Sequence, residues 1–305
     1  MTLARSVGWR DPEPAGLGTR VRTGGSVILV IGATGSVGSE VLTQLIDAGE
    51  PVRASVSSSK SIAGYGGETV RCDFGDPATF GPALDGVDRL FLMRPPAISD
   101  VKRFMRPFIE QAAHVGVAHT VFMSVMGVNR VMPHWQVERD IEAAALSHTF
   151  LRPAFFTQNL SNAYRDDIAV HNRIRLPAGN GRTSFIDVRD VATVAVLALR
   201  TPAAHHGKAY TLTGDNNWSY NEVADLLTTC LGRRITYDRV SFLRYRRELR
   251  LAGLPTDYVR VQLLINAVAR LGLAGHITET FAELVGRAPM ALAESLNDLR
   301  SAWAR

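Results

Sequence analysis

Three glycines spaced three residues apart, Gly32, Gly35 and Gly38, mark the segment of the chain whose chemistry is clearest. They follow an apolar run over 27–31, typical of a buried parallel strand, and they precede an amphipathic helix over 40–47. Such a turn offers free backbone N–H groups and the positive end of a helix dipole to a pyrophosphate. Gly32 would permit the tight turn, Gly35 the close approach of phosphates and Gly38 the packing of helix on strand. The spacing predicts a nucleotide-binding turn, and a purely structural turn is the alternative.

Strands and helices alternate through the first half of the chain, as a doubly wound parallel sheet requires. We expect strands at 27–31, 51–56, 68–73, 88–93, 118–124, 149–152 and 209–213. We expect helices at 40–47, 102–115, 135–146 and, capped by Asp190, 190–199. A capping box at Ser219 and Glu222 predicts a helix that ends at Gly232, and the remainder is mainly helical. The predicted fold class is α/β: a Rossmann-like doubly wound parallel sheet with a smaller, mainly helical C-terminal substrate lobe.

These elements divide the chain into three parts. Residues 1–25 lack the apolar core of a secretory signal, and we expect a flexible tail there. Residues 26–214 are expected to form a NAD(P)-binding Rossmann domain, with parts of 155–187 facing the substrate cleft. Residues 215–305 are expected to form the substrate lobe.

The composition is that of a globular protein, with 46% hydrophobic and 21% charged residues in a chain of 305. No apolar run approaches the roughly 20 residues that cross a bilayer, so no membrane association is expected. Cys72 and Cys230 are predicted to be reduced core thiols of a cytoplasmic protein, not a disulfide. The net charge is +5, and seven arginines gather in 233–250. No helix-turn-helix signature accompanies them, so we expect a solvated face or a subunit contact and no nucleic-acid surface.

Several later motifs resemble those of the NmrA-like group of atypical short-chain dehydrogenase/reductases. The resemblance runs from about Ser26 to the C-terminus. Its specific segments are 72–77, 92–96, 123–127, 134–138, 151–160, 185–190 and 210–214. The group includes type 2 quinone oxidoreductases, triphenylmethane reductase and NmrA-type redox sensors. The resemblance therefore implies a NAD(P) cofactor without choosing among these members.

The resemblance also implies three groups of cofactor contacts. The pyrophosphate is expected on Gly32, Thr34, Gly35, Ser36, Val37 and Gly38. The adenine is expected on Asp73 and Phe74, although Asp73 could equally cap a turn with Pro77. The middle of the cofactor is expected on Met93, Arg94 and Pro95, and the nicotinamide on Pro153, Phe155 and Phe156. For the last two residues, plain core packing is the alternative.

The end of the second strand bears on the choice between NADP and NAD. A carboxylate there would bind the ribose of NAD, but the chain has three serines and a lysine at 57–60. Hydroxyls and an ammonium suit a 2′-phosphate, so we expect NADP on Ser57 and Lys60, with NAD or an ordinary exposed loop as alternatives. Many relatives have an arginine where Ser57 stands. A bidentate phosphate contact would here require Arg53 to turn toward the site.

The Tyr-x-x-x-Lys acid pair of ordinary short-chain dehydrogenases is missing. Alignment on His134 and Glu138 places Arg130 at the tyrosine position and His134 at the lysine position. Without that general acid, reduction of an unactivated ketone loses about 10²–10⁴ in rate. A quinone, an imine or iminium or a dye cation does not need the acid. We therefore expect hydride transfer to such an activated acceptor, with any proton coming from solvent or from His134.

The candidate catalytic residues are His134 and Ser124, although a lone hydroxyl is a poor proton donor. The imidazole of His134 could donate a proton, bond the nicotinamide ribose or merely cap the helix that begins near Trp135. Glu138 shares its helix face and could fix its tautomer or make a surface contact. The candidate substrate residues are Trp135, Gln158 and Asn159, and no metal site is predicted.

Two functions fit these residues. The first is a cytoplasmic NADP-dependent oxidoreductase that acts on a small molecule, with a homodimer left open. The alternative is a regulator that senses NADP(H) and binds a protein partner without turnover. A sugar-nucleotide epimerase is disfavoured because that chemistry needs the absent tyrosine base.

Overall fold

The computed structural model describes residues 26–56 and 67–304, and in these residues seven parallel strands form one sheet. In sheet order they are β10 (Lys208–Leu212), β6 (His148–Pro153), β5 (His119–Met123), β4 (Val87–Met93), β1 (Val27–Val30), β2 (Val52–Val56) and β3 (Glu68–Arg71). Strands β2 and β3 follow β1 on one side of the sheet, and β5, β6 and β10 follow β4 on the other. The carboxyl ends of β1 and β4 therefore form the topological switch point, the place at which open α/β sheets bind ligands. The predicted Rossmann-like fold is confirmed.

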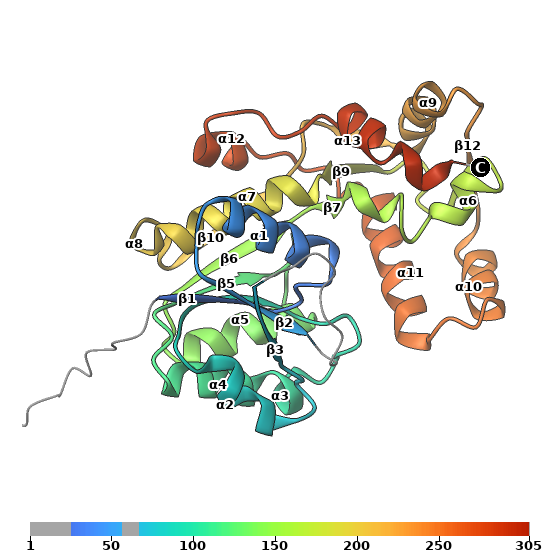
Figure 1. Cartoon of the computed structure of the whole chain (residues 1–305). Helices are drawn as coiled ribbons and strands as arrows, with labels where there is room; N and C mark the ends of the chain where they lie inside the picture. Colours follow the sequence, from blue (N-terminus) through green and yellow to red (C-terminus); the bar gives the residue numbers. More distant parts are fainter. Residues whose placement is uncertain (1–25, 57–66, 305) are drawn as a thin grey trace, which may run out of the picture.

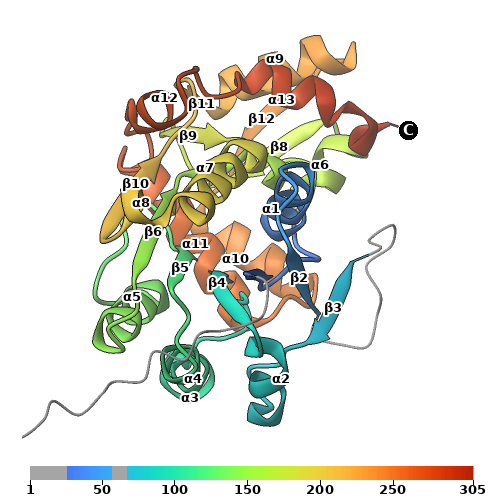
Figure 2. The ribbon, with the colours of Figure 1, turned by 60° about the vertical axis from the view of Figure 1, so that its left-hand side comes forward.

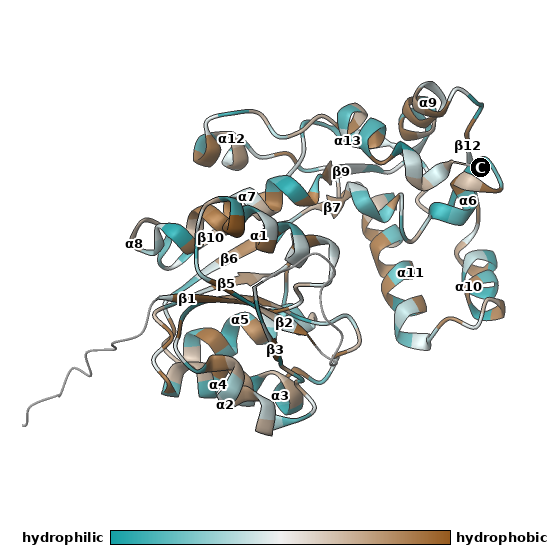
Figure 3. Cartoon of the chain, in the orientation of Figure 1, coloured by the Kyte–Doolittle hydropathy of each residue, from teal (hydrophilic) through white to brown (hydrophobic). Residues whose placement is uncertain are grey.

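Helices cover both faces of this sheet (Figures 1 and 2). One face is covered by α1 (Ser36–Asp47) and α7 (Val188–Arg200), with α8 (Pro202–His205) beside them. The other is covered by η1 (Pro77–Thr79), α2 (Phe80–Leu84), α3 (Val101–Phe104), α4 (Arg106–His114) and α5 (Pro133–Ala143). Side chains alternate along β1, so Ile28 and Val30 enter one apolar core and Leu29 the other. The colouring in Figure 3 shows this apolar interior along the strands.

Most of the remaining elements form a smaller lobe beside the carboxyl edge of the sheet (Figure 1). Its helices are η2 (Thr157–Asn159), α6 (Arg165–Ala169), α9 (Tyr220–Leu231), α10 (Phe242–Leu251), α11 (Thr256–Arg270), α13 (Leu292–Asp298) and η3 (Arg300–Trp303). Helix α12 (Thr280–Val285) instead packs on α7 and β10, and its Phe281 enters the core of the large sheet. The strands of the lobe are β7 (Phe155–Phe156), β8 (Arg173–Leu176), β9 (Arg182–Ile186), β11 (Asn217–Ser219) and β12 (Thr236–Arg239). These strands form two small sheets, β11-β9-β7 and β12-β8, which the sequence did not predict.

Two predicted helix boundaries need correction and one is confirmed. Helix α7 is capped by Asp187, whose carboxylate accepts from the N–H of Arg189. Asp190 does not cap this helix: it is fully buried and accepts from the Arg287 guanidinium at 2.8 Å. The predicted helix over 102–115 is divided into α3 and α4. The capping box of α9 is present as predicted, and Gly232 ends that helix with a φ of 64°.

Both cysteines are free thiols. Cys72 follows β3 and is buried, which raises its pKa to about 12, whereas Cys230 lies partly exposed on α9. In the described part of the chain, no helix is long and apolar enough to cross a bilayer. No three His, Cys, Asp or Glu side chains of those residues are grouped to hold a metal ion.

Candidate functional site

The glycine turn joins β1 to α1, and two of its glycines cannot be replaced without a clash. Gly32 has a φ of 75°, and a Cβ on it would lie 2.1 Å from Sδ of Met93. A Cβ on Gly38 would lie 2.1 Å from the backbone oxygen of Gly32. Around Gly35 the nearest atom to such a Cβ is that same oxygen, at 3.4 Å. The helix and strand therefore pack tightly on one side of the turn, and the side at Gly35 is open.

The first turn of α1 presents backbone donors to this open side. The N–H groups of Ser36, Val37 and Gly38 have no intrahelical acceptor, and they donate to no other described residue. Gly35 is the N-cap and supplies no capping side chain, and no acidic residue lies in the first turn. The positive end of the helix dipole is therefore not neutralised by the protein. These features fit a dinucleotide diphosphate.

Arg94 follows Met93 at the carboxyl end of β4. Its Nη1 donates to the backbone oxygens of Pro95 (3.1 Å), Pro96 (3.3 Å) and Ile98 (2.5 Å). Its Nε is buried and has no hydrogen-bond partner, and no carboxylate of the described residues pairs with it. Burial lowers the pKa of this guanidinium. Arg94 thus places an uncompensated positive charge beside the crevice.

Ser124 lies immediately after β5, where its N–H donates to the backbone oxygen of Leu151 (2.7 Å). Its side chain is 4% exposed, and its Oγ has no hydrogen-bond partner in the described residues. A buried hydroxyl without a partner is unfavourable by about 1–3 kcal/mol. The hydroxyl is therefore available for a bound ligand.

His134 lies in the first turn of α5. The N-cap of that helix is Met132, so His134 is not its cap. Burial and the nearby Arg94 lower the pKa of His134 to about 4. The imidazole is therefore neutral at pH 7, and it can donate or accept a hydrogen bond there without carrying a second proton.

Glu138 does not have either of the roles expected for it. It is 1% exposed, and its carboxylate accepts from Nε (3.0 Å) and Nη2 (2.7 Å) of Arg152 on β6. It therefore neither contacts His134 nor lies on the surface. The pair joins α5 to the sheet below the site.

The predicted adenine residues take part in a turn and in the core. Oδ1 of Asp73 accepts from the N–H of Gly75 (2.9 Å), so the turn alternative for Asp73 is present. The ring of Phe74 is buried edge-on against Phe80 and Phe108, with centroids at 6.4 and 5.3 Å. This ring offers no open stacking face, and an adenine contact here stays a prediction.

Arg53 cannot supply the phosphate contact. It is 9% exposed and donates to Glu68 (2.7 Å) and to the backbone oxygens of Ala83 and Asp85. Its Nε and Nη1 are therefore held by Glu68 and by these backbone oxygens. Ser57 and Lys60 lie outside the described residues, as does the predicted tail over 1–25.

The residues expected around the nicotinamide lie where β6 passes into β7. Pro153 is buried at the end of β6. Phe155 packs edge-on against Phe185 at 5.5 Å, and Phe156 packs on the core beneath α1 and α7. Both phenylalanine rings remain partly exposed, so they take part in packing and still present a surface.

The three candidate substrate residues have different surroundings. Oε1 of the buried Gln158 accepts from the N–H of Val188 (3.1 Å), which holds the start of α7. Asn159 is partly exposed in η2. Trp135 lies beneath the exposed guanidinium of Arg139, 5.8 Å from the ring centroid. Gln158 therefore has a structural partner already, and the structure does not bring the three side chains together.

Helix α11 lies in a segment, 255–265, that resembles the pocket-covering helices of the family, and it has exposed apolar side chains. Tyr258, Val261 and Leu264 are 37%, 49% and 51% exposed. Helix α11 stands opposite the carboxyl edge of the sheet (Figure 1). The helical spacing of these residues was the available signal, because Val259 and Gln262 alternate with them on the buried side.

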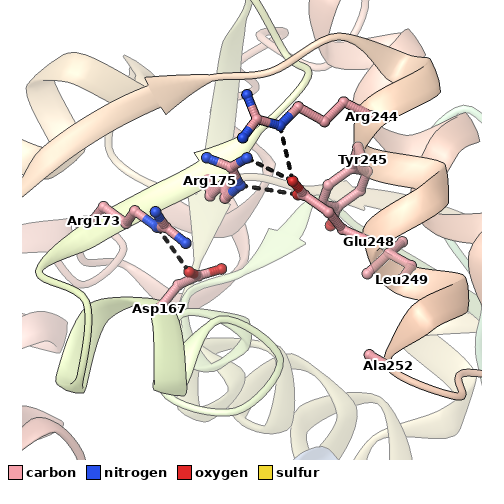
Figure 4. Close-up of a pocket in the computed structure, with 8 residues that line it drawn as sticks. All are labelled: Asp167, Arg173, Arg175, Arg244, Tyr245, Glu248, Leu249 and Ala252. Atoms are coloured by element: carbon pink, nitrogen blue, oxygen red, sulfur yellow. Dashed lines mark hydrogen bonds and ion pairs between the residues drawn. The ribbon is translucent and has the colours of Figure 1, made fainter.

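A separate hollow of about 410 Å³ lies between α6, β8 and α10 (Figure 4). Its charged lining residues are Asp167, Arg173, Arg175, Arg244 and Glu248. The arginines there point at carboxylates: Arg173 at Asp167, and Arg175 and Arg244 at Glu248. Asp238, next to the hollow, pairs with Arg175 as well, so three carboxylates balance the three arginines.

The arginine-rich stretch 233–250 is mostly a solvated surface. Arg246, Arg247 and Arg250 are exposed on α10. Arg233 instead donates to the backbone oxygen of Ile168. The expected solvated face is present, and a subunit contact there stays a prediction.

Comparison with known proteins identifies the family. The profile of the NmrA-like family matches residues 24–272. The NAD(P)H azoreductase of Xenophilus azovorans is 30% identical over 277 residues, which cover 88% of this chain and 96% of that protein. The chain therefore belongs to the NmrA-like family.

Solved structures agree with the fold. The NADPH-dependent quinone oxidoreductase of Escherichia coli, solved with NADPH, has a TM-score of 0.78 and is 26% identical, over 90% of this chain and 99% of that one. The triphenylmethane reductase of Citrobacter sp., solved with NADP(H), has a TM-score of 0.78 at 23% identity and the same coverage. The second likeness supports the fold alone.

Proposed function

We propose that this protein is an NADPH-dependent oxidoreductase that passes hydride to an activated small-molecule acceptor: a quinone, an imine or iminium, or a dye-like compound. The observation that carries the proposal is the glycine turn, where three unpaired N–H groups face an open side that has no neutralising carboxylate. Relatives with the same fold include an azoreductase and a quinone oxidoreductase whose names specify NAD(P)H or NADPH.

The residues that would hold the cofactor follow from this turn. The N–H groups of Ser36 to Gly38 bind the diphosphate, with Thr34 beside them. Met93, Arg94 and Pro95 line the middle of the cofactor, and Pro153, Phe155 and Phe156 flank the nicotinamide. Ser57 and Lys60 bind the 2′-phosphate. When bound, the reduced nicotinamide supplies a hydride.

The side chains near the crevice explain why the acceptor must be activated. Arg130 stands where ordinary relatives have tyrosine, and it is exposed. His134 is neutral at pH 7 because its pKa is about 4. Neither side chain is an effective general acid at that pH, so the acceptor must tolerate the added hydride before a proton arrives from water. Ser124 Oγ and the His134 ring serve as hydrogen-bonding groups for the bound molecules.

The exposed apolar side chains of α11 suit an acceptor with a flat apolar body. We also propose a cytoplasmic location, because two free thiols suit a reducing compartment. A homodimer is an additional proposal, tested by light scattering.

Steady-state loss of NADPH absorbance against quinones, azo compounds, iminium ions and cationic dyes tests the function. Turnover with at least one class supports it. Tight NADPH binding with no turnover on any class would favour the alternative, an NADP(H)-sensing regulator, which the missing Tyr–Lys pair also suits. Absence of NADPH binding would refute both.

A further inference from the structure

Arg94 is partly buried, and no carboxylate of the described residues pairs with its guanidinium. Arg53 pairs with Glu68, Arg152 with Glu138, and Arg175 with Glu248. Arg94 contacts only backbone oxygens of its own loop. A buried charge without a partner is costly, so a folded protein keeps one where a ligand completes it.

The edge of the Arg94 guanidinium that has no partner indicates what kind of group it can bind. Arg152 uses Nε and Nη2 to hold both oxygens of Glu138, and Arg175 uses the same two atoms to hold Glu248. In Arg94 the three loop carbonyls occupy Nη1, and Nε has no partner. The edge with which this protein binds carboxylates elsewhere is therefore unused in Arg94, and the loop fixes its orientation.

The position of this edge relates it to the proposed chemistry. Arg94 directly follows Met93, which lies against Gly32 of the phosphate turn, and it is close enough to His134 to lower the pKa of that imidazole. It therefore lies at the carboxyl ends of β1 and β4, between the expected middle of the cofactor and His134. Among the described side chains, no carboxylate pairs with it there.

We propose that Arg94 binds the acceptor oxygen on which negative charge develops, so that quinones and similar conjugated carbonyl compounds are the preferred acceptors and cations are not. The inference rests on the proposed function and names its substrate class. A quinone gains a hydride from NADPH, which is oxidised to NADP⁺, and the resulting hydroquinone monoanion then takes one proton from water. Arg94 stabilises that monoanion electrostatically, in place of the missing tyrosine. A dye cation or iminium would instead be repelled.

Variants at Arg94 test this assignment by acceptor class. Arg94→Gln removes the charge, and Arg94→Lys keeps it without the planar fork. Arg103→Gln is the matched control, because Arg103 is an exposed arginine of nearby α3 whose guanidinium lies over the Phe104 ring. We expect Arg94→Gln to lower kcat/KM for quinones by about 10²–10³ while kcat/KM for a cationic triphenylmethane dye stays equal or rises. The loss of kcat/KM for quinones should be smaller in Arg94→Lys than in Arg94→Gln. Arg103→Gln should have the kcat/KM of the wild type for both kinds of acceptor.

Two kinetic results would overturn the assignment. Equal losses with quinones and cationic dyes would show that Arg94 has no role specific to the developing anion. Weaker NADPH binding by fluorescence titration, with an unchanged kcat at saturating NADPH, would instead place Arg94 on the cofactor diphosphate.

A spectroscopic measurement tests the same site without turnover. With NADP⁺ present, 4-nitrophenol imitates the hydroquinone monoanion, and its absorbance reports its ionisation. We expect the wild type to lower the pKa of the bound phenol by about one to three units, and Arg94→Gln to abolish that shift. No shift in the wild type, or an equal shift in the variant, refutes the inference. A shift that depends on Arg94, in a protein that reduces no acceptor, would refute the proposed function and leave the anion site standing.

Discussion

Replacing Glu138 with glutamine should destabilise the protein strongly and leave its chemistry unchanged. The substitution keeps the shape of the side chain but removes the countercharge of Arg152, whose side chain is 29% exposed. Loss of one partner of a buried ion pair costs about 3–5 kcal/mol. Because Arg152 keeps some contact with water, we expect the lower end, about 3 kcal/mol. At about 2–4 °C per kcal/mol, Tm should fall by about 6–12 °C.

Thermal unfolding followed by circular dichroism measures this loss, and Glu142→Gln provides the control. Glu142 lies on the same helix and pairs with Arg139, but both side chains are substantially exposed, at 33% and 43%. Its loss should cost less than about 1 kcal/mol. The reasoning is refuted if Glu138→Gln leaves Tm unchanged but lowers kcat, because Glu138 would then act through His134 and not through Arg152.

Three other predictions concern the phosphate turn, a buried hydroxyl and a buried histidine. Gly38→Ala should abolish NADPH binding in a fluorescence titration, because its Cβ would lie 2.1 Å from a backbone oxygen, whereas Gly81→Ala, with nothing within 4 Å, should bind normally. Ser124→Ala should lower kcat/KM without lowering Tm, since the Oγ has no partner to lose; a fall in Tm with normal kinetics would contradict this. Burial, followed by His206, His148 and His205, lowers the pKa of His119 to about 4, below the unfolded value of 6.5. Between pH 6.5 and pH 4, His119 therefore binds a proton in the unfolded chain but not in the folded chain. The free energy of unfolding falls as pH drops through this range. In urea unfolding, the wild type should lose about 2 kcal/mol more stability than His119→Gln between pH 7 and pH 5, and the loss left in the variant is that of His134. An equal loss in the two proteins would exclude His119 as a cause.

The sequence predicted the parts of the fold in which local pattern and tertiary packing agree. The apolar run of β1, its glycines and helix α1 form such a unit, because Gly38 is required by the backbone of Gly32 and Gly32 by Met93. Strands β8 and β12 were not predicted, because each has only four residues. Over so short a length, the pattern of polar and apolar residues cannot be distinguished from that of a loop.

The candidate site was predicted least well where a side chain's partner lies far along the chain. Glu138 is four residues from His134, but its partner is Arg152 on another element. Asp187 and Asp190 both suit the cap of an apolar helix, and partners about a hundred residues away distinguish them: Arg287 and the N–H of Met290 bind Asp190, whereas Ser295 binds Asp187. In the same way, the missing countercharge of Arg94 depends on every neighbour that the fold brings to it, so spacing alone could not reveal it.

The last turn of the chain has a practical consequence. Trp303 is 1% exposed, its indole N–H donates to the backbone oxygen of Leu160 (3.1 Å), and its own oxygen accepts from Arg233 (3.1 Å). Removing this indole would leave a void of the kind that costs about 3–5 kcal/mol. Purification handles and fusion partners therefore belong at the amino end. A deletion that starts at residue 303 should loosen the lobe that covers the cleft before it disturbs the nucleotide-binding sheet.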